Sequence, residues 1–348
     1  MNQDDTFLRR AIVLAKLGRG RVEPNPMVGC VIVRDGRIVG EGFHEAFGGP
    51  HAEPNALNAM IEHGESSVGA TAYVTLEPCC HANKNTPPCA PRLIAAGVAR
   101  VVIGCLDPNP QVNGHGVAML RAAGIGVDVS EALNDECRQL IAPFAIGQLH
   151  RRPYVTLKWA KSADGRVAGP GGMPVRITGP EATLIVHALR TRSHAIVVGP
   201  RTVITDNPSL TARDVDIIRQ PRRFVLARHT SLPETSTLFS DQHPPAIVIA
   251  SLDDIALEYA GMHVLVEPGP VLAEALLPSA DRLWVFESPD VIGLHNAPQA
   301  AEVPLTYVMT GRIEFGRDTL TEYLNTQSPA FFANTESADL SVLPEPRV

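Results

Sequence analysis

The sequence predicts an α/β protein with two domains, and three observations support this prediction. The chain has 348 residues, which is about the length of two typical domains. Hydrophobic residues make up 45% of the chain and charged residues 19%, so there is enough apolar surface to form stable cores. Segments with apolar residues at helical spacing alternate with short apolar runs typical of buried strands. Such alternation is typical of a partly parallel sheet covered by helices.

The first half of the chain begins with a helix and a β-hairpin. Apolar residues recur at helical spacing over 7–15, and a glycine follows as a stop signal. Two apolar runs, 28–33 and 38–43, flank Asp35-Gly36, a dipeptide that favours a tight hairpin turn. Pro143 is expected to kink or break the last helix of this half. The same criteria predict helices over 52–61, 92–96, 117–123 and 131–149, and strands over 72–76, 101–105 and 125–129.

The domain boundary is expected at residues 151–153, a charged break that ends in proline. We therefore predict one domain over 1–150 and a second over 151–325. Residues 326–348 are polar and lack periodicity, so a disordered tail is expected there. Within the second domain we predict strands over 154–159, 195–199, 224–226, 246–250, 263–266 and 283–286, a loop rich in glycine and proline over 169–174, a helix over 180–190, and a loop leading into a helix over 269–277.

Charge and cysteine usage narrow the function classes. The formal net charge is −7, whereas a nucleic-acid-binding protein usually presents a basic face. No apolar run approaches the length of about 18 residues that a membrane span needs, and the polar, acidic N-terminus is unlike a signal or transit peptide. A cytoplasmic protein is therefore expected, in which the six cysteines act as ligands, nucleophiles or small core residues. Cys30 and Cys105 lie in apolar strands and are expected in the core.

One group of residues has the composition of a metal site. His51, Cys79 and Cys89 supply one nitrogen and two sulfurs, the donors that zinc prefers, and leave a fourth position open. Glu53 lies two residues after the histidine, where a carboxylate can relay protons during a hydrolysis. A His-x-Glu followed by Pro-Cys is typical of zinc-dependent nucleobase deaminases, although nine residues separate the two cysteines here. A closed structural zinc site with Cys80 or His81 as fourth ligand is the alternative.

Longer motifs extend this pattern through both halves of the chain. The sequence resembles the bifunctional deaminase/reductase family of riboflavin biosynthesis over roughly residues 5–320. The motifs that carry the resemblance in the first half are PNPMVGCV at 24–31, GEGFH at 40–44, HAE at 51–53, YVTLEPC at 73–79, TPPC at 86–89 and DPNPQVNG at 107–114. Those in the second half are RPYVTLK at 152–158, SADGR at 162–166 and TVITDNPSLTAR at 202–213.

The resemblance implies a cytidine-deaminase-like three-layer α/β/α fold for the first domain. It implies that His51, Cys79 and Cys89 hold zinc and that Glu53 shuttles protons. The stretch between the two cysteines is one residue longer than is usual in the family, so Lys84 either binds substrate from a shifted position or is a solvated surface lysine. The residues that would contact the pyrimidine substrate are Asn25, His44, Lys84, Asp107, Asn109 and Asn113.

For the second domain the resemblance implies a dihydrofolate-reductase-like α/β fold that uses NADPH, which agrees with the absence of a Gly-x-Gly-x-x-Gly fingerprint. The hydride would pass directly from the cofactor to the ribose carbon. The substrate would be bound by Arg190, Leu210, Arg213 and Glu267. The cofactor would be bound by Ala160, Thr202, Asp206, Gly269, Pro270, Val271, Leu272, Ala273, Glu274 and Ala275.

The second domain also departs from the family pattern. Pro174 and Arg176 replace a serine and a tryptophan, Ala227 replaces an aspartate, and Pro268 removes a backbone donor from a glycine-rich turn. Arg176 either pairs with an NADPH phosphate or marks a reductase domain that has lost activity. A deaminase with a degenerate second domain, serving structure or oligomerisation, is therefore the alternative to a bifunctional enzyme.

The preferred interpretation is a bifunctional enzyme with two cofactors, zinc and NADPH. It would deaminate 2,5-diamino-6-ribosylamino-4(3H)-pyrimidinone 5′-phosphate and then reduce the ribosyl group to ribityl. By the resemblance the protein is expected to form homo-oligomers and to act on this small molecule, without nucleic acid or membrane partners. An enzyme that deaminates bases in nucleic acid and a non-enzymatic zinc-binding module are the remaining alternatives, and the acidic charge balance disfavours the first.

Overall fold

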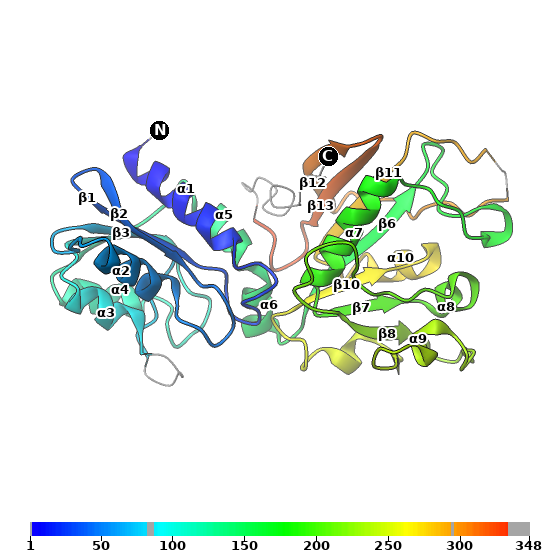
Figure 1. The fold of residues 1–348 in the computed structure, drawn as a ribbon, viewed down its shortest axis with the longest axis horizontal. Helices are drawn as coiled ribbons and strands as arrows, with labels where there is room; N and C mark the ends of the chain where they lie inside the picture. The colour runs from blue at the N-terminus through cyan, green and yellow to red at the C-terminus, as the bar shows by residue number, and fades with distance from the viewer. Residues whose placement is uncertain (1, 82–86, 294–295, 333–348) are drawn as a thin grey trace. The chain divides into compact units, whose positions relative to one another are not determined.

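The chain divides into two compact units at the bond between His150 and Arg151. We describe a computed structural model of residues 2–81, 87–293 and 296–332, shown in Figure 1. Each unit has its own β-sheet and hydrophobic core, so the mixed α/β class predicted from the alternation of elements is confirmed.

The first unit is a five-stranded sheet in the order β2-β1-β3-β4-β5. Strand β1 pairs antiparallel with β2 and β3, whereas β3, β4 and β5 run parallel. Helices α1 and α5 cover one face, and α2, α3 and α4 cover the other, which gives three layers (Figure 1). The strands are β1 Gly29–Arg34, β2 Arg37–Phe43, β3 Thr71–Leu76, β4 Arg100–Cys105 and β5 Gly126–Val129. The helices are α1 Gln3–Lys16, α2 Ala52–Glu62, α3 Cys89–Ala95, α4 His115–Ala122, α5 Asn134–Leu140 and α6 Ala142–His150.

Two local predictions in this unit are confirmed by the backbone. Asp35 and Gly36 have φ of +53° and +75°, the left-handed pair that a tight hairpin turn of the I′ type needs. The segment predicted as one long helix is two helices, α5 and α6, and the break falls just before Pro143. Proline has no N–H to continue a helix from the preceding turn, but it is accepted in the first turn of a new helix.

Helix α2 lies unusually close to strand β2. A Cβ atom added at Gly42 would stand 2.3 Å from the backbone nitrogen of Ala56, and one added at Gly40 would stand 2.4 Å from the carbonyl oxygen of Ala56. Only glycine permits such an approach of two backbones. The packing fixes the N-terminal end of α2, where two of the predicted site residues are found.

The second unit is an eight-stranded sheet in the order β12-β13-β11-β6-β10-β7-β8-β9. Strands β11, β6, β10, β7, β8 and β9 are parallel, and β13 and β12 add an antiparallel edge. The strands are β6 Tyr154–Lys161, β7 Ala195–Val198, β8 Arg222–Leu226, β9 Ile247–Ile249, β10 His263–Glu267, β11 Arg282–Glu287, β12 Tyr307–Phe315 and β13 Asp318–Asn325. The helices are α7 Pro180–Arg192, α8 Pro200–Asp206, α9 Thr237–Ser240 and α10 Pro270–Leu276, with 3₁₀ turns η1 Pro170–Gly172 and η2 Leu252–Ile255.

The sequence criteria missed the β12–β13 hairpin and helix α8. Strand β12 is buried only at its two ends, Tyr307 and Phe315, and is exposed or partly buried between them, so it lacks the apolar run by which the other strands were found. The chain also remains ordered past Asn325, where the predicted tail begins. Ala330 is only 3% exposed, and the Ser328 hydroxyl donates to Asp281 at 2.6 Å. Residues 333–348 of the predicted tail lie outside the described residues.

Asp281 is the buried anchor of the second unit. Its side chain is almost fully buried and accepts two hydrogen bonds from the Arg152 guanidinium at 2.7 and 2.8 Å. It also accepts the Val155 backbone N–H at 2.8 Å. The carboxylate therefore ties the start of β6 to the start of β11.

We predict that Asp281→Asn destabilises the second unit by about 2–3 kcal/mol, because the Arg152 charge and one backbone donor lose their partner. Both tryptophans of the chain, Trp159 and Trp284, lie in this unit, so denaturant unfolding followed by tryptophan fluorescence isolates the effect. Asp290→Asn, which breaks an exposed pair with Arg317, is the matched control, expected to cost less than about 0.5 kcal/mol. Equal midpoints for the two variants would contradict this prediction.

Candidate functional site

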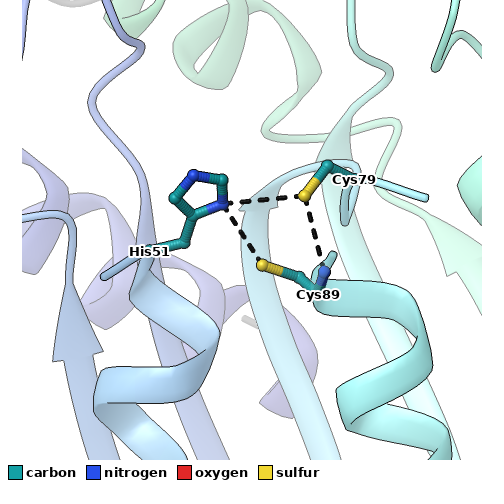
Figure 2. A group of neighbouring side chains, drawn as sticks. All are labelled: His51, Cys79 and Cys89. Carbon is teal, nitrogen blue, oxygen red and sulfur yellow. Dashed lines mark hydrogen bonds between the residues drawn. The ribbon is translucent and has the colours of Figure 1, made fainter. Parts of the chain in front are cut away.

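Three elements of the first unit bring the predicted metal ligands together. His51 is the residue before helix α2, Cys79 follows strand β3, and Cys89 is the first residue of α3. Nδ1 of His51 lies 3.3 Å from Sγ of Cys89 and 3.6 Å from Sγ of Cys79. Figure 2 shows the three side chains pointing toward one another, and their donor atoms all lie within 4.8 Å. One imidazole and two thiolates in this arrangement fit a zinc ion.

Backbone hydrogen bonds to Cys79, one of them to its sulfur, connect it to the start of helix α3. The backbone N–H of Cys89 donates to Sγ of Cys79 at 3.4 Å, and the N–H of Ala90 donates to the Cys79 carbonyl at 3.0 Å. Among the described residues, Cys80 and His81 are not part of the ligand group. The geometry therefore favours three protein ligands with an open position over a closed structural site.

Glu53 stands in the first turn of α2 beside these ligands. It is 3% exposed, and burial, reinforced by the neighbouring Cys79, raises the pKa of its carboxyl group. A raised pKa favours a carboxyl group that accepts a proton and returns it. The position is therefore suited to the proton relay expected from the sequence.

A cavity of about 370 Å³ opens above the ligand group. Four of the six predicted pyrimidine contacts line it: Asn25, His44, Asp107 and Asn109. Nδ2 of Asn25 lies 3.1 Å from Nε2 of His44, so these two side chains are positioned by each other. The sequence reasoning missed further lining residues, chiefly Glu77 at the end of β3, and Phe144 and Gln148 of α6.

Of the two remaining predicted contacts, only one is among the described residues, and it does not line this cavity. Asn113 is exposed and is not among the lining residues; its backbone N–H instead bonds the Asn109 carbonyl at 3.0 Å. Lys84 lies outside the described residues. The missed residues of α6 had no local signal, because their place beside the ligands depends on the break before Pro143.

A larger cavity, about 810 Å³, lies in the second unit along the carboxyl ends of β6, β7 and β10. Most of the residues predicted to bind NADPH line it, as does the predicted substrate residue Glu267. Ala273 and Glu274 are exceptions, because Ala273 faces the core at 2% exposure and Glu274 is not among the lining residues of α10. The lining residues that were predicted are Ala160, Thr202, Asp206, Glu267, Gly269, Pro270, Val271, Leu272 and Ala275.

The other predicted substrate residues do not line this cavity. Arg190 forms a bidentate pair with Glu267, at 2.8 and 3.0 Å, so each charge neutralises the other. Leu210 is buried, with φ of +55°. Arg213 is on the surface, with Nε 3.8 Å from the Asp214 carboxylate. Charges and their order in the chain are visible in the sequence, but the partner of each charge depends on the fold.

Glu267 is ionised in spite of its burial. Burial alone raises the pKa of a carboxyl group, but the charges of Arg190 and Lys158 outweigh this and hold the pKa of Glu267 at about 2. Nζ of Lys158 lies 3.9 Å from the carboxylate, and this residue lines the cavity. Burial lowers the pKa of this lysine. Lys158 is part of a motif that carries the family resemblance, but it was not among the predicted site residues.

Two more cations line the same cavity without a carboxylate partner among the described residues. Arg176 forms no ion pair there, and Arg201 donates to the Gly171 carbonyl at 3.2 Å. Pro268 lines the cavity at the end of β10. Pro174 is not a lining residue, and Ala227 is buried in the core of the unit.

Two family models match the chain, one in each half. Residues 1–105 match the cytidine and deoxycytidylate deaminase zinc-binding region, and residues 153–306 match the RibD C-terminal domain. None of the helices in the described ranges is both long and apolar enough to cross a membrane.

The chain is similar to several proteins named riboflavin biosynthesis protein RibD. That of Aquifex aeolicus is 38% identical over 318 residues, which cover 83% of this chain and 88% of the relative. That of Escherichia coli is 40% identical over 332 residues, covering 84% and 89%.

The fold is also similar to that of solved structures over nearly the whole chain. A diaminohydroxyphosphoribosylaminopyrimidine deaminase/5-amino-6-(5-phosphoribosylamino)uracil reductase from Thermotoga maritima superposes with a TM-score of 0.82 at 35% identity, covering 93% of this chain and 99% of that one. Acinetobacter baumannii RibD superposes with a TM-score of 0.81 at 34% identity and the same coverage.

We predict that Cys89→Ser lowers the zinc content from about one ion per chain to less than about a tenth, because two protein ligands cannot retain the ion against dialysis. Elemental analysis of the purified protein gives the stoichiometry, and tryptophan fluorescence checks that the second unit is folded. Cys80→Ser is the matched control, since this thiol is outside the ligand group, and it should keep its zinc. Loss of zinc from Cys80→Ser would contradict a three-ligand site.

Proposed function

The chain belongs to the bifunctional deaminase/reductase family of riboflavin biosynthesis, and we propose that its two units perform these two reactions on one pyrimidine nucleotide. The substrate is 2,5-diamino-6-ribosylamino-4(3H)-pyrimidinone 5′-phosphate, which is first deaminated and then reduced at its ribosyl group. Residues 1–150 carry the deaminase and 151–325 the NADPH-dependent reductase. The observation that carries the proposal is the His51, Cys79 and Cys89 ligand group beside a buried Glu53.

In the deaminase cavity the chain's own residues bind the ring and move protons. A bound zinc ion supplies an activated water for attack on the amino-bearing ring carbon. Glu53 takes a proton and returns it to the departing ammonia, a role that its burial and raised pKa support. Asn25 and His44 bind from one wall of the cavity, and Asp107 and Asn109 bind from the loop after β4.

In the reductase cavity Ala160, Thr202 and Asp206 hold the cofactor together with the turn that begins at Gly269. NADPH supplies the hydride that reduces the ring-opened ribose carbon. Glu267 orients the ribose, and the Arg190 pair keeps its carboxylate ionised and fixed. The roles of Leu210 and Arg213 in binding the substrate stay predictions from the family resemblance, because neither residue lines the cavity.

Two guanidinium groups of this cavity suit the phosphate that distinguishes NADPH from NADH. Arg176 and Arg201 both line it, and guanidinium groups bind phosphate through paired N–H donors. Arg176 stands where the family usually has tryptophan. We assign the 2′-phosphate of the cofactor to these two residues.

The remaining proposals concern the setting of the enzyme. The net charge of −7 supports a small-molecule substrate over nucleic acid. From the family resemblance we propose that the protein forms homo-oligomers, and from the polar N-terminus and the lack of a long apolar run that it acts in the cytoplasm without a membrane partner.

We predict that Glu53→Gln keeps zinc but lowers ammonia release at least about a thousandfold, because the proton relay is lost. The same chain should oxidise NADPH at the normal rate when given the already deaminated pyrimidine. This second assay is the internal control for folding, and it also tests the reductase. Near-normal ammonia release would refute the role of Glu53, and failure of the parent protein to oxidise NADPH would refute the reductase assignment.

We predict that Arg176→Ala with Arg201→Ala weakens NADPH binding about 10- to 100-fold and leaves NADH binding within about threefold, since only NADPH carries the 2′-phosphate. The dissociation constants are measured by quenching of tryptophan fluorescence, without turnover. Arg228→Ala, which removes an exposed arginine that lies outside the lining, is the control. Equal weakening of both cofactors would contradict the assignment.

A further inference from the structure

Glu77 is a buried carboxylate to which the deaminase chemistry gives no task. It is 2% exposed and follows strand β3, two residues before the ligand Cys79. No ion pair joins it to a cation within the described residues. An ionised group in such a place needs other partners, because burying a charge without compensation is costly.

The partners of Glu77 are three backbone N–H groups from one segment. Oε2 accepts the N–H of Asp107 at 3.3 Å and the N–H of Gly114 at 2.9 Å. Oε1 accepts the N–H of Val117, in the first turn of α4, at 3.1 Å. One carboxylate oxygen therefore holds both ends of the loop 107–114.

The loop between these two anchor points is organised from its own side chains. The Asp107 carboxylate accepts the Asn109 N–H at 2.8 Å, and the Asn109 side chain accepts the Gln111 N–H at 3.0 Å. Such short-range bonds shape a turn, but they do not set where the turn lies. The three N–H bonds to Glu77 fix the two ends of the turn beside the cavity, and the fully buried Val112 packs its middle against the unit.

The Glu77 carboxylate is closely packed against the start of helix α4. A Cβ atom added at Gly116 would stand 2.2 Å from the Pro78 carbonyl oxygen and 3.1 Å from Oε1 of Glu77. The start of α4 therefore lies directly against the turn that leads from Glu77 to Cys79. A short rigid segment carries both the loop anchor and a metal ligand, so the distance between the metal and the loop is fixed.

We propose that Glu77 is a positioning residue of the deaminase: it holds the loop 107–114 so that Asp107 and Asn109 meet the pyrimidine nucleotide at a fixed distance from the metal. The inference rests on the proposed function, which assigns substrate contacts to these two residues. Glu77 acts through the loop, and its loss therefore affects substrate binding more than metal binding.

The test is Glu77→Gln in the full-length, zinc-loaded protein. An amide keeps the size of the side chain but has a single acceptor oxygen, so at least one of the three N–H groups loses its partner. We expect KM for the pyrimidine nucleotide to rise about 10- to 100-fold, with kcat less affected. Zinc should stay at about one ion per chain, and NADPH oxidation with the deaminated pyrimidine should be unchanged.

Hydrogen–deuterium exchange gives a readout that does not depend on turnover. In the Glu77→Gln protein, peptides covering 106–118 should exchange faster, and the rest of the first unit should not. Glu77→Asp, whose carboxylate is one methylene too short to reach the same donors, should reproduce both effects. Glu65→Gln is the matched control, because this carboxylate of the same unit pairs with Arg34 and Arg37 away from the cavity.

Each contrary result has a distinct meaning. Unchanged exchange over 106–118, or loss of zinc or of the fold in both variants, overturns the proposal, since Glu77 would then serve the metal turn or the core. The variant Asn109→Ala distinguishes failure of the positioning role of Glu77 from failure of the proposed substrate contacts. If Asn109→Ala raises KM and Glu77→Gln does not, only the positioning role falls; if neither raises KM, the assignment of the loop to the substrate falls as well.

Discussion

The deaminase unit depends on one steric constraint, the close approach of helix α2 to strand β2. Gly40 and Gly42 allow the two backbones to come within distances that any side chain would prevent. This approach sets the N-terminal end of α2, and with it His51 and Glu53. The parallel strands β3 and β4 then bring Cys79 and the loop 107–114 to the same edge of the sheet. The metal ligands come from three different elements, and they meet because the sheet fixes the position of each element.

In the reductase unit, the main feature is a group of charged side chains buried at the wall of the cavity. Glu267, Arg190 and Lys158 are each mostly buried, and the two cations hold the pKa of Glu267 low although burial alone would raise it. Arg176 and Arg201 remain without a carboxylate partner among the described residues. The cavity wall thus includes part of a neutralised charge cluster and, at Arg176 and Arg201, a positive region.

Sequence patterns predicted what depends on near neighbours. Asp35-Gly36 specified its turn, Pro143 its helix break, and the order of His51, Cys79 and Cys89 its donor set, because each follows from local chemistry. Sequence patterns did not predict the features that depend on contacts between residues far apart in the chain. Strand β12 buries only its two end residues and pairs along its length with β13. Arg190 pairs with a glutamate 77 residues away in the chain. No residue near Glu77 in the sequence indicates its three backbone donors. The roles of the individual site residues stay predictions.

The attachment of the two cysteines has an evolutionary consequence. Cys79 follows strand β3, Cys89 begins helix α3, and the N–H groups of Cys89 and Ala90 donate to Sγ and the carbonyl oxygen of Cys79. Neither sulfur depends on the number of residues between 80 and 88. This connection is therefore free to gain or lose residues during divergence while the donor set stays intact.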